Sequence, residues 1–446
     1  MGTYRRLVVG IVLVVLGVRA GGAQGGSNPS QFAIWRSLMR RALYVPEVLP
    51  PLEPRVWSTF SPMPGVIADR VTYRTASGML VPAVVYRPEH WAGQAKGVKL
   101  PGIVVVNGHG GDKYSWYAFY SGMMFAQAGA EVVTYDPIGE GERNIDKKSR
   151  ASSHDKQVTP PAGLPVDDWG QRLAGLMQVD LMQGISYLAQ RPEVDPRRIA
   201  VVGYSMGAFV TGIAGAIDPR IHAVLLSGGG TFDDQADVGK SYDVGTLPCQ
   251  AAPWHALKVL GEGPHQRGAV LYALNAERGP MLVENGSQDT VMDIPHRTPE
   301  WFAAMRTQAV ALDRANGGTA ANMFTTHVDA EKSHRTAWVE RTGVLWLNQQ
   351  IHFATWSEAE IEKAPVTHVS EWINANHVDI SSGYLREDRE GGLMALGTGF
   401  PGISRDQLMV LKDADWVRLQ GELTYESWAS KTKAAEEADV KALGGK

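Results

Sequence analysis

The chain has 446 residues, of which 44% are hydrophobic and 20% are charged, and its formal net charge is −4. This composition is typical of a globular protein with enough apolar side chains for a large core. No basic block is present, so nucleic acid is excluded as an expected partner. The single cysteine, Cys249, excludes an internal disulfide, and it lies in a segment without a nucleophile pattern, which disfavours a catalytic thiol.

The first residues have the pattern of a secretory signal peptide. Arg5 and Arg6 precede an unbroken apolar run over residues 7–18, and small residues follow over 20–23. The apolar run is too short to span a membrane comfortably, which disfavours an anchor. We therefore predict a cleaved signal peptide over 1–23, a secreted or periplasmic protein, and no membrane contact after cleavage.

The next segment, residues 24–65, is rich in glycine, serine and proline. We expect one helix over 31–43 and otherwise an extended arm that wraps the surface. Residues 66–74 and 79–86 follow as two strand patterns joined by a short turn that contains Gly78. They predict an antiparallel hairpin.

From residue 100 onward, short apolar strand patterns alternate with longer helical ones. Strands are predicted over 103–106, 131–135, 199–202, 221–226, 280–284 and 323–328, and helices over 114–128, 169–190, 295–315 and 336–350. This alternation predicts an α/β fold, a mostly parallel eight-stranded sheet with helices on both faces. Residues 66–352 form the main domain, with an insertion over about 231–279, and 353–446 form an appended, helix-containing C-terminal extension.

The strand over 199–202 leads into Gly203-Tyr204-Ser205-Met206-Gly207, and a run of small and apolar residues follows. A strand, a Gly-x-Ser-x-Gly motif and a helix in this order predict a nucleophile elbow. The two glycines are needed because the turn is sharp and side chains there would collide with neighbouring elements. Ser205 is then held in a strained conformation with its hydroxyl exposed.

A serine hydroxyl needs a base to accept its proton, and the base needs a carboxylate to orient it. Such groups gather at the carboxyl ends of parallel strands. Asp289 follows the strand over 280–284, with Asp293 as the second choice, and His334 follows the strand over 323–328. The chain order Ser205, Asp289, His334 is that of α/β-hydrolases. The other histidines considered lie in less suitable positions: His222, His255, His265, His296, His327 and His352.

The loop after the strand over 103–106 is glycine-rich, and it predicts an oxyanion hole. Gly111 is the expected donor from this loop, with Gly110 next, and the backbone N–H of Met206 is the second donor. The loop lacks the lysine and serine or threonine of a phosphate-binding loop. In the following loop, we interpret Asp136 and Arg143 as a buried ion pair that fixes the backbone.

These motifs resemble those of α/β-hydrolases, and within them the dienelactone hydrolase and acetyl xylan esterase-like proteins. The resemblance is carried by the His109-Gly110-Gly111 loop, the segment 135–143, the elbow, the segment 280–289 and Ser333-His334. It covers roughly residues 66–350. Dienelactone hydrolases carry cysteine at the elbow, whereas this chain has Ser205, which favours esters. Residues after 355 have no counterpart in the compact family pattern.

The sequence thus predicts an exported serine carboxylesterase, with 66–352 as its catalytic domain. The expected substrate is a small-molecule or polysaccharide ester, with acetyl esters of polysaccharides as one candidate class, and Tyr204 and Trp116 are expected to contact it. No cofactor is expected, and no metal, since no group of His, Cys and Asp has metal-ligand spacing along the chain. Two alternatives remain: a serine peptidase of the prolyl oligopeptidase type, and a non-catalytic binding protein on a hydrolase fold.

Overall fold

The structure is a computed structural model that describes residues 30–155, 166–232, 248–263, 265–297, 299–380 and 392–442. The predicted signal peptide and part of the predicted insertion, residues 233–247, lie outside the described residues. None of the helices in these ranges combines the length and apolar character that a membrane span requires.

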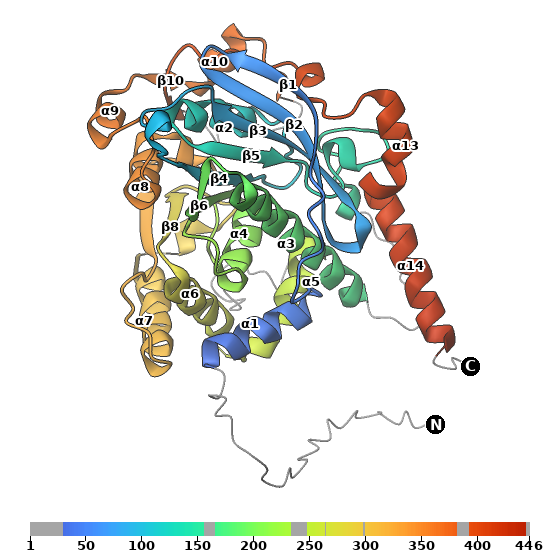
Figure 1. Ribbon diagram of the computed structural model, residues 1–446. Helices are drawn as coiled ribbons and strands as arrows, with labels where there is room; N and C mark the ends of the chain where they lie inside the picture. Colours follow the sequence, from blue (N-terminus) through green and yellow to red (C-terminus); the bar gives the residue numbers. More distant parts are fainter. Residues whose placement is uncertain are drawn as a thin grey trace, which may run out of the picture.

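One nine-stranded sheet organises the molecule (Figure 1). Its spatial order is β1-β2-β3-β5-β4-β6-β7-β8-β9. The strands from β4 to β9 are parallel, and β1, β2 and β3 form an antiparallel edge that joins β5 through β3. Their bounds are β1 Arg55–Met63, β2 Val66–Arg74, β3 Leu80–Pro88, β4 Leu100–Val106, β5 Glu131–Tyr135, β6 Val194–Tyr204, β7 Ala223–Ser227, β8 Met281–Gly286 and β9 Thr325–Asp329.

The predicted mostly parallel sheet is confirmed, with one strand more than expected. That strand is β1, which lies inside the segment predicted as an extended arm. Its residues are exposed or half-buried throughout, so no apolar alternation marks it in the sequence. It contains Pro62, near which its register with β2 shifts between Phe60 and Met63. Proline and irregular register are typical of edge strands, which need no neighbour on one side.

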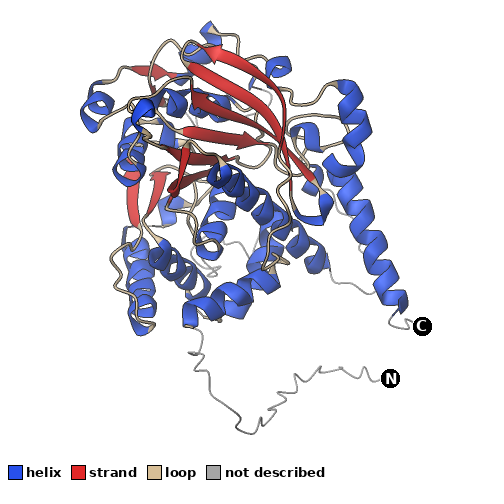
Figure 2. Cartoon of the chain, in the orientation of Figure 1, coloured by secondary structure: helices blue, strands red, loops and turns tan. Residues whose placement is uncertain are grey.

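Helices cover both faces of the sheet, as predicted (Figure 2). Alternate residues of the central strands enter two separate apolar cores: Val104 and Val106 face one core, and Ile103 and Val105 face the other. The first core includes side chains of α1 Gln31–Ala42, α3 Val166–Gln190, α4 Met206–Ile217, α5 Pro248–Ala256, α6 Gln266–Arg278 and α7 Pro299–Ala315. The second includes α2 Trp116–Ala128 and α8 Arg341–Ile351.

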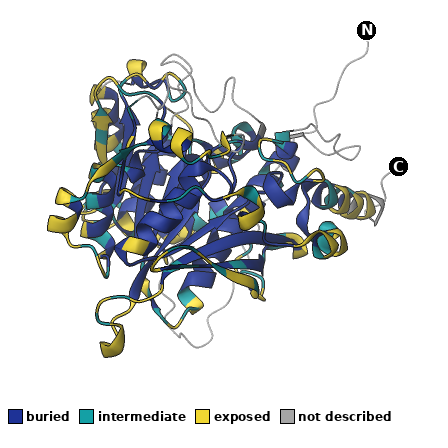
Figure 3. Ribbon diagram, turned by 90° about the horizontal axis from the view of Figure 1, so that it is seen from above, coloured by how far each residue is buried: buried dark blue, intermediate teal, exposed yellow. Residues whose placement is uncertain are grey.

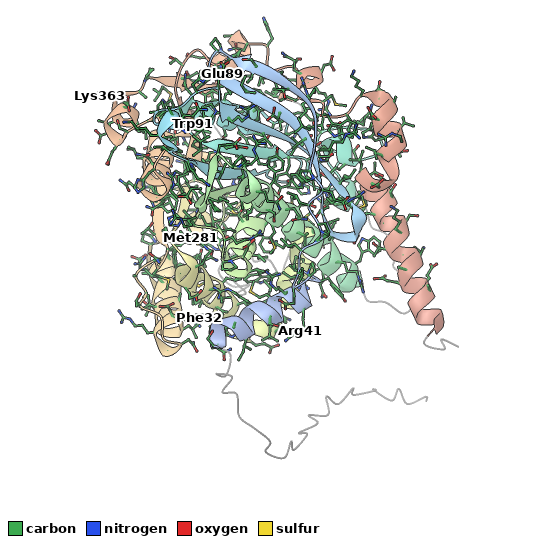
Figure 4. The ribbon with its side chains drawn as sticks, in the orientation of Figure 1. Phe32, Arg41, Glu89, Trp91, Met281 and Lys363 are labelled. Carbon is green, nitrogen blue, oxygen red and sulfur yellow. The ribbon has the colours of Figure 1, made fainter. Side chains whose placement is uncertain are left out.

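The central sheet and its covering helices form the buried interior of the molecule (Figure 3). Side chains fill the space between these layers (Figure 4), and Met281, labelled there at the start of β8, is 2% exposed. Helix α6 leads directly into β8, so the second half of the predicted insertion is the helix that connects β7 to β8. The described part of the insertion therefore contributes to the core.

The C-terminal extension packs on the molecule as an integral layer. It comprises α9 Glu358–Lys363, β10 Val366–His368, α10 Val369–Ala375, β11 Met394–Leu396, α12 Arg405–Leu408, α13 Asp413–Leu423 and α14 Tyr425–Ala442. Most of its buried side chains join the core that contains α2 and α8. Figure 1 shows α13 and α14 running down one side of the molecule.

Trp372 of α10 is the main aromatic anchor of this extension. Its ring meets Tyr120 edge to face at 5.0 Å, and its indole N–H donates to the Phe400 carbonyl at 2.7 Å. We expect Trp372→Ala to lower the free energy of unfolding by about 3–5 kcal/mol, because it opens a cavity in a closed aromatic cluster. Chemical denaturation measures this loss. The 66% exposed Val417 is the control, since Val417→Ala should stay within about 0.5 kcal/mol of the wild type. Equal effects of both substitutions would contradict the anchoring role.

Candidate active site

Ser205 occupies a sharp turn between β6 and α4. Its φ of 54° and ψ of −115° place it in a region that non-glycine residues rarely adopt. The Ser205 N–H donates to the Ser227 carbonyl at 3.0 Å, which ties the turn to the end of β7. The strand, turn and helix expected around the motif are therefore present.

The two glycines of the motif are required by close backbone contacts. A Cβ at Gly203 would lie 2.4 Å from the Gly207 carbonyl oxygen, and one at Gly207 would lie 2.3 Å from the Val106 carbonyl oxygen. Neither neighbour is a flexible side chain, so no larger residue fits at either position. The glycines thus let α4 start directly against the end of β4.

Asp289 and His334 form a buried pair at the neighbouring strand ends. His334 Nδ1 lies 2.7 Å from Asp289 Oδ2, and the two residues are 4% and 0% exposed. The other carboxylate oxygen, Oδ1, accepts the N–H groups of Val291 and Met292 at 2.9 Å each. Because the carboxylate accepts the Nδ1 proton, Nε2 is left with a lone pair that can accept a proton.

The His334 ring lies beside the turn that holds Ser205. It packs on Tyr204, the residue before Ser205, with ring centroids 4.8 Å apart. It is also so close to Gly228 that a Cβ there would lie 2.8 Å from its Cε1 atom. Gly228 follows Ser227, whose carbonyl accepts the Ser205 N–H. The structure thus gathers Ser205, Asp289 and His334 beyond the carboxyl ends of β6, β8 and β9.

The second choice for the acid, Asp293, is engaged elsewhere. Its carboxylate contacts His296 Nδ1 at 2.7 Å and Arg297 at 3.2 Å. Two of the other histidines also contact groups outside the candidate site. His222 Nε2 lies 3.1 Å from the Gln350 carbonyl, and His327 Nε2 lies 3.1 Å from Asp329.

The glycine-rich loop after β4 differs in one detail from the expectation. The Gly111 N–H donates to the Gly108 carbonyl at 2.9 Å, so this expected oxyanion donor is already used within a turn. A Cβ at Gly111 would also lie 2.2 Å from the Tyr117 hydroxyl. Within the described part of the chain, the N–H groups of Met206, His109 and Gly110 have no acceptor. Met206 and Gly110 therefore stay candidates, and His109 joins them.

The two residues predicted to contact substrate are both buried in aromatic packing. Trp116 is 0% exposed and lies against Tyr117, Tyr120 and Trp372, so its indole faces cannot stack on a sugar. The prediction missed that α2 is buried on nearly all sides. Tyr204 is 4% exposed, and its ring supports the His334 imidazole instead of offering a surface to substrate.

A buried charge cluster stabilises the loop after β5. It consists of Lys113, Asp136 and Glu142. The Lys113 ammonium contacts the Asp136 carboxylate and lies 2.7 Å from Glu142, and all three side chains are fully buried. Burial alone would lower the pKa of Lys113, but the attraction of the two carboxylates holds it above its ordinary value. Glu142 also accepts the N–H groups of Val410 and Leu411 at 2.9 Å each, which ties the C-terminal extension to this loop.

Asp136 and Arg143, which were predicted to pair with each other, each form an ion pair with a different residue. Arg143 pairs with Asp180 of α3, and only the Asp136 backbone carbonyl contacts it, at 3.2 Å. The Asp136 carboxylate pairs with Lys113 instead. Both residues do hold the loop, but the sequence offered no signal for Lys113 and Asp180, whose partners lie far away along the chain.

Two groups of potential metal ligands occur among the described residues. His109, His154, Asp155 and Cys249 form the first group, and Glu284, His327 and Asp329 form the second. The second group offers three ligands against four in the first, and its His327 and Asp329 contact each other at 3.1 Å. The first combines residues from three separate segments, so their spacing along the chain gave no sign of it.

Glu284, near the end of β8, makes the stability of the protein depend on pH. It is 1% exposed, and neither carboxyl oxygen has a hydrogen-bond partner among the described residues. Burial, reinforced by Asp329, raises its pKa from 4.5 to about 8. The folded state therefore binds more protons than the unfolded state between these values, so stability falls as the pH rises across this window.

We expect Glu284→Gln to reduce this loss of stability. At about 1.4 kcal/mol for each pKa unit, the loss in the wild type amounts to a few kcal/mol. Denaturation curves of wild type and variant at pH 4.5, 6 and 8.5 measure the difference. Parallel pH profiles for the two proteins would show that Glu284 does not carry the effect.

The family model of the alpha/beta hydrolase family matches residues 103–389, which is more than half of the chain. The chain therefore belongs to the α/β-hydrolase family. Among curated proteins, it is similar to Thiohydrolase apmlB of Arthrinium phaeospermum, with 26% identity over 159 residues. That similarity covers 36% of this chain and 42% of the relative, so it spans less than half the length of either protein.

Solved structures with a similar fold include two esterases. An acetyl xylan esterase from Paenibacillus sp. R4 has 16% identity and a TM-score of 0.44, and the match covers 72% of this chain and 93% of that one. A glucuronoyl esterase from Solibacter usitatus has 16% identity and a TM-score of 0.48, with 68% and 88% covered.

Proposed function

We propose that this protein is an exported serine hydrolase that cleaves carboxylic esters through an acyl-enzyme on Ser205. The observation that carries the proposal is the buried Asp289–His334 pair, 2.7 Å apart, packed beside the strained turn of Ser205. A nucleophile, a base with a free Nε2 and a carboxylate that orients it are the parts this chemistry needs.

In the proposed reaction, His334 Nε2 accepts the Ser205 proton while Ser205 Oγ attacks the acyl carbon. The negative charge that develops on the acyl oxygen is stabilised by the Met206 N–H and by an N–H of the His109-Gly110 loop. His334 then donates its proton to the leaving alcohol, and an acyl-enzyme remains. A water molecule, deprotonated by His334, releases the acid and restores Ser205.

The proposed substrates are esters with a small acyl group, and acetyl esters of polysaccharides are the class that the sequence resemblance implies. Export is supported by the basic, apolar and small-residue pattern of residues 1–23. N-terminal sequencing of the protein recovered from outside the cytoplasm tests export. A mature start near residue 24 is expected, and an uncleaved chain would contradict it.

The reaction class is tested by comparing p-nitrophenyl acetate with a peptidyl p-nitroanilide. The proposal expects the acetate to have the higher kcat/KM, and a p-nitrophenyl ester series of increasing acyl length to show a decline. Faster turnover of the anilide would instead identify a serine peptidase. The same series with acetylated and deacetylated xylan tests the polysaccharide substrate, with acetate release as the measured product.

A further inference from the structure

The structure brings four potential metal ligands together next to the catalytic loop. His109 belongs to the loop after β4, His154 and Asp155 to the single turn Ser153–Asp155, and Cys249 to the first turn of α5. One ligand atom from each lies within 4.8 Å of all the others. Three segments that are far apart in the sequence thus converge on one point.

Two of these side chains carry buried acceptor atoms without a hydrogen bond of ordinary geometry, and the Cys249 thiol lies close enough to the Asp155 carboxylate to interact with it. His154 Nδ1 donates to the Ile138 carbonyl at 2.9 Å, so its Nε2 atom carries a lone pair. This Nε2 atom and Asp155 Oδ1 are both buried, and neither has a hydrogen-bond partner among the described residues. They lie 3.8 Å apart. Two unpaired acceptors facing each other in the interior are unfavourable unless something positive lies between them.

A proton on His154 Nε2 does not remove the mismatch. At 3.8 Å the two atoms are farther apart than in a hydrogen bond. The separation is close to the distance of about 3.3 Å between two nitrogen or oxygen ligands of one tetrahedral zinc ion, for bonds of about 2.0 Å. A metal ion accounts for both orphaned atoms at once.

We propose that His109, His154, Asp155 and Cys249 bind a divalent transition-metal ion, with Zn²⁺ as the best match. Two imidazoles, one thiolate and one carboxylate are a set of ligands that zinc accepts in tetrahedral geometry. The Ile138 carbonyl fixes the His154 tautomer, as outer-shell acceptors do in zinc sites. The side chains of His109 and Asp155 are 26% and 18% exposed, which gives the ion a path from solvent.

Binding changes the protonation of two ligands. His109 Nε2 contacts Asp155 Oδ2, a hydrogen bond that the ion would replace. The His109 proton then resides on Nδ1, and the Cys249 thiol releases its proton to the solvent. No electron is transferred, and no other reactant is needed.

The ion would link the two segments that carry the candidate N–H donors of the oxyanion hole. His109 lies in the catalytic loop, and Cys249 Sγ is 3.8 Å from Met206 Sδ. This consequence, unlike metal binding itself, rests on the proposed function. We expect removal of the ion by a chelator to lower kcat for p-nitrophenyl acetate roughly tenfold, since a loosened donor loses part of its stabilisation.

Metal binding is tested directly with Co²⁺ and Zn²⁺ on the full protein. We expect one equivalent of Co²⁺ to give a thiolate-to-cobalt charge-transfer band and intense visible bands of tetrahedral cobalt. Calorimetric titration with Zn²⁺ should show one site. Cys249→Ser should abolish the charge-transfer band, and Cys249→Ser and His154→Ala should each weaken Zn²⁺ binding by more than about 100-fold.

The matched control is His296→Ala, which removes an exposed histidine outside the cluster and should leave binding unchanged. Circular dichroism confirms that each variant is folded, and Cys249→Ala serves if the serine variant is not. Absence of the charge-transfer band in the wild type, or unchanged Zn²⁺ affinity in both ligand variants, would overturn the proposal. Labelling of Ser205 by a fluorophosphonate is independent of these readouts, so failure of the metal site and failure of the hydrolase mechanism are distinguishable.

Discussion

Ser205→Ala is expected to lower kcat for p-nitrophenyl acetate by about 10⁶-fold, the scale of loss seen when other serine hydrolases lose their nucleophile. The substitution removes one oxygen atom and leaves the backbone turn, which is fixed by Gly203, Gly207 and the bond to the Ser227 carbonyl. Binding of a non-hydrolysed product analogue should therefore change little. Steady-state kinetics and a binding titration measure the two quantities.

The control for this variant is Ser149→Ala, which removes a hydroxyl that contacts Asp112 and Arg405 instead of the triad. Its kcat should stay within about tenfold of the wild type. If Ser205→Ala keeps a substantial part of the wild-type kcat, the nucleophile is another group, and the proposed mechanism fails.

The second large effect is expected for Asp289→Asn, with a loss of about 10⁴-fold in kcat, as for the equivalent change in other triads. The two N–H groups of Val291 and Met292 hold Oδ1 at 2.9 Å each, so the asparagine oxygen should take that position. Its amide nitrogen then faces His334 Nδ1. The imidazole must accept there, its proton moves to Nε2, and the base can no longer take the Ser205 proton.

Asp293→Asn is the comparison that tests this assignment. Asp293 contacts His296 and Arg297, so its substitution should affect stability more than kcat. Kinetics of both variants, together with their unfolding curves, separate the two roles. A large loss of kcat in Asp293→Asn with little loss in Asp289→Asn would reverse the roles of the two carboxylates.

The sequence predicted the central sheet because the buried parallel strands are continuous apolar runs. The run over 103–106, for example, lies within β4, whose residues are all buried. The edge strand β1 was missed for the opposite reason, since its side chains are exposed or half-buried. Expected and observed helix ends differ most at α7 and α8, where short turns over 294–296 and 337–339 precede the regular helices.

The proximity of the three proposed triad residues could be predicted because each follows a recognisable strand, and the carboxyl ends of parallel strands lie on one side of the sheet. The structure brings Asp289 and His334 together at 2.7 Å and sets His334 beside the Ser205 turn. Trp116 was misinterpreted because its helix is buried on nearly all sides, which its aromatic composition did not reveal.

The buried charges and the candidate metal ligands could not be predicted from the sequence. Lys113 meets Asp136 and Glu142 because the loops after two different strands converge, and His109 meets His154, Asp155 and Cys249 because two loops and the start of α5 converge. Neither set has a fixed spacing along the chain. Loop geometry of this kind depends on tertiary packing, which local patterns do not encode.

The measurement that tests the central claim most directly is covalent labelling with a fluorophosphonate, followed by peptide mapping. The proposed mechanism predicts one adduct per chain, located on Ser205, which is absent in Ser205→Ala and formed much more slowly in Asp289→Asn. A folded wild-type protein that takes up no label, or that takes it up equally in Ser205→Ala, would contradict the assignment of Ser205 as the nucleophile.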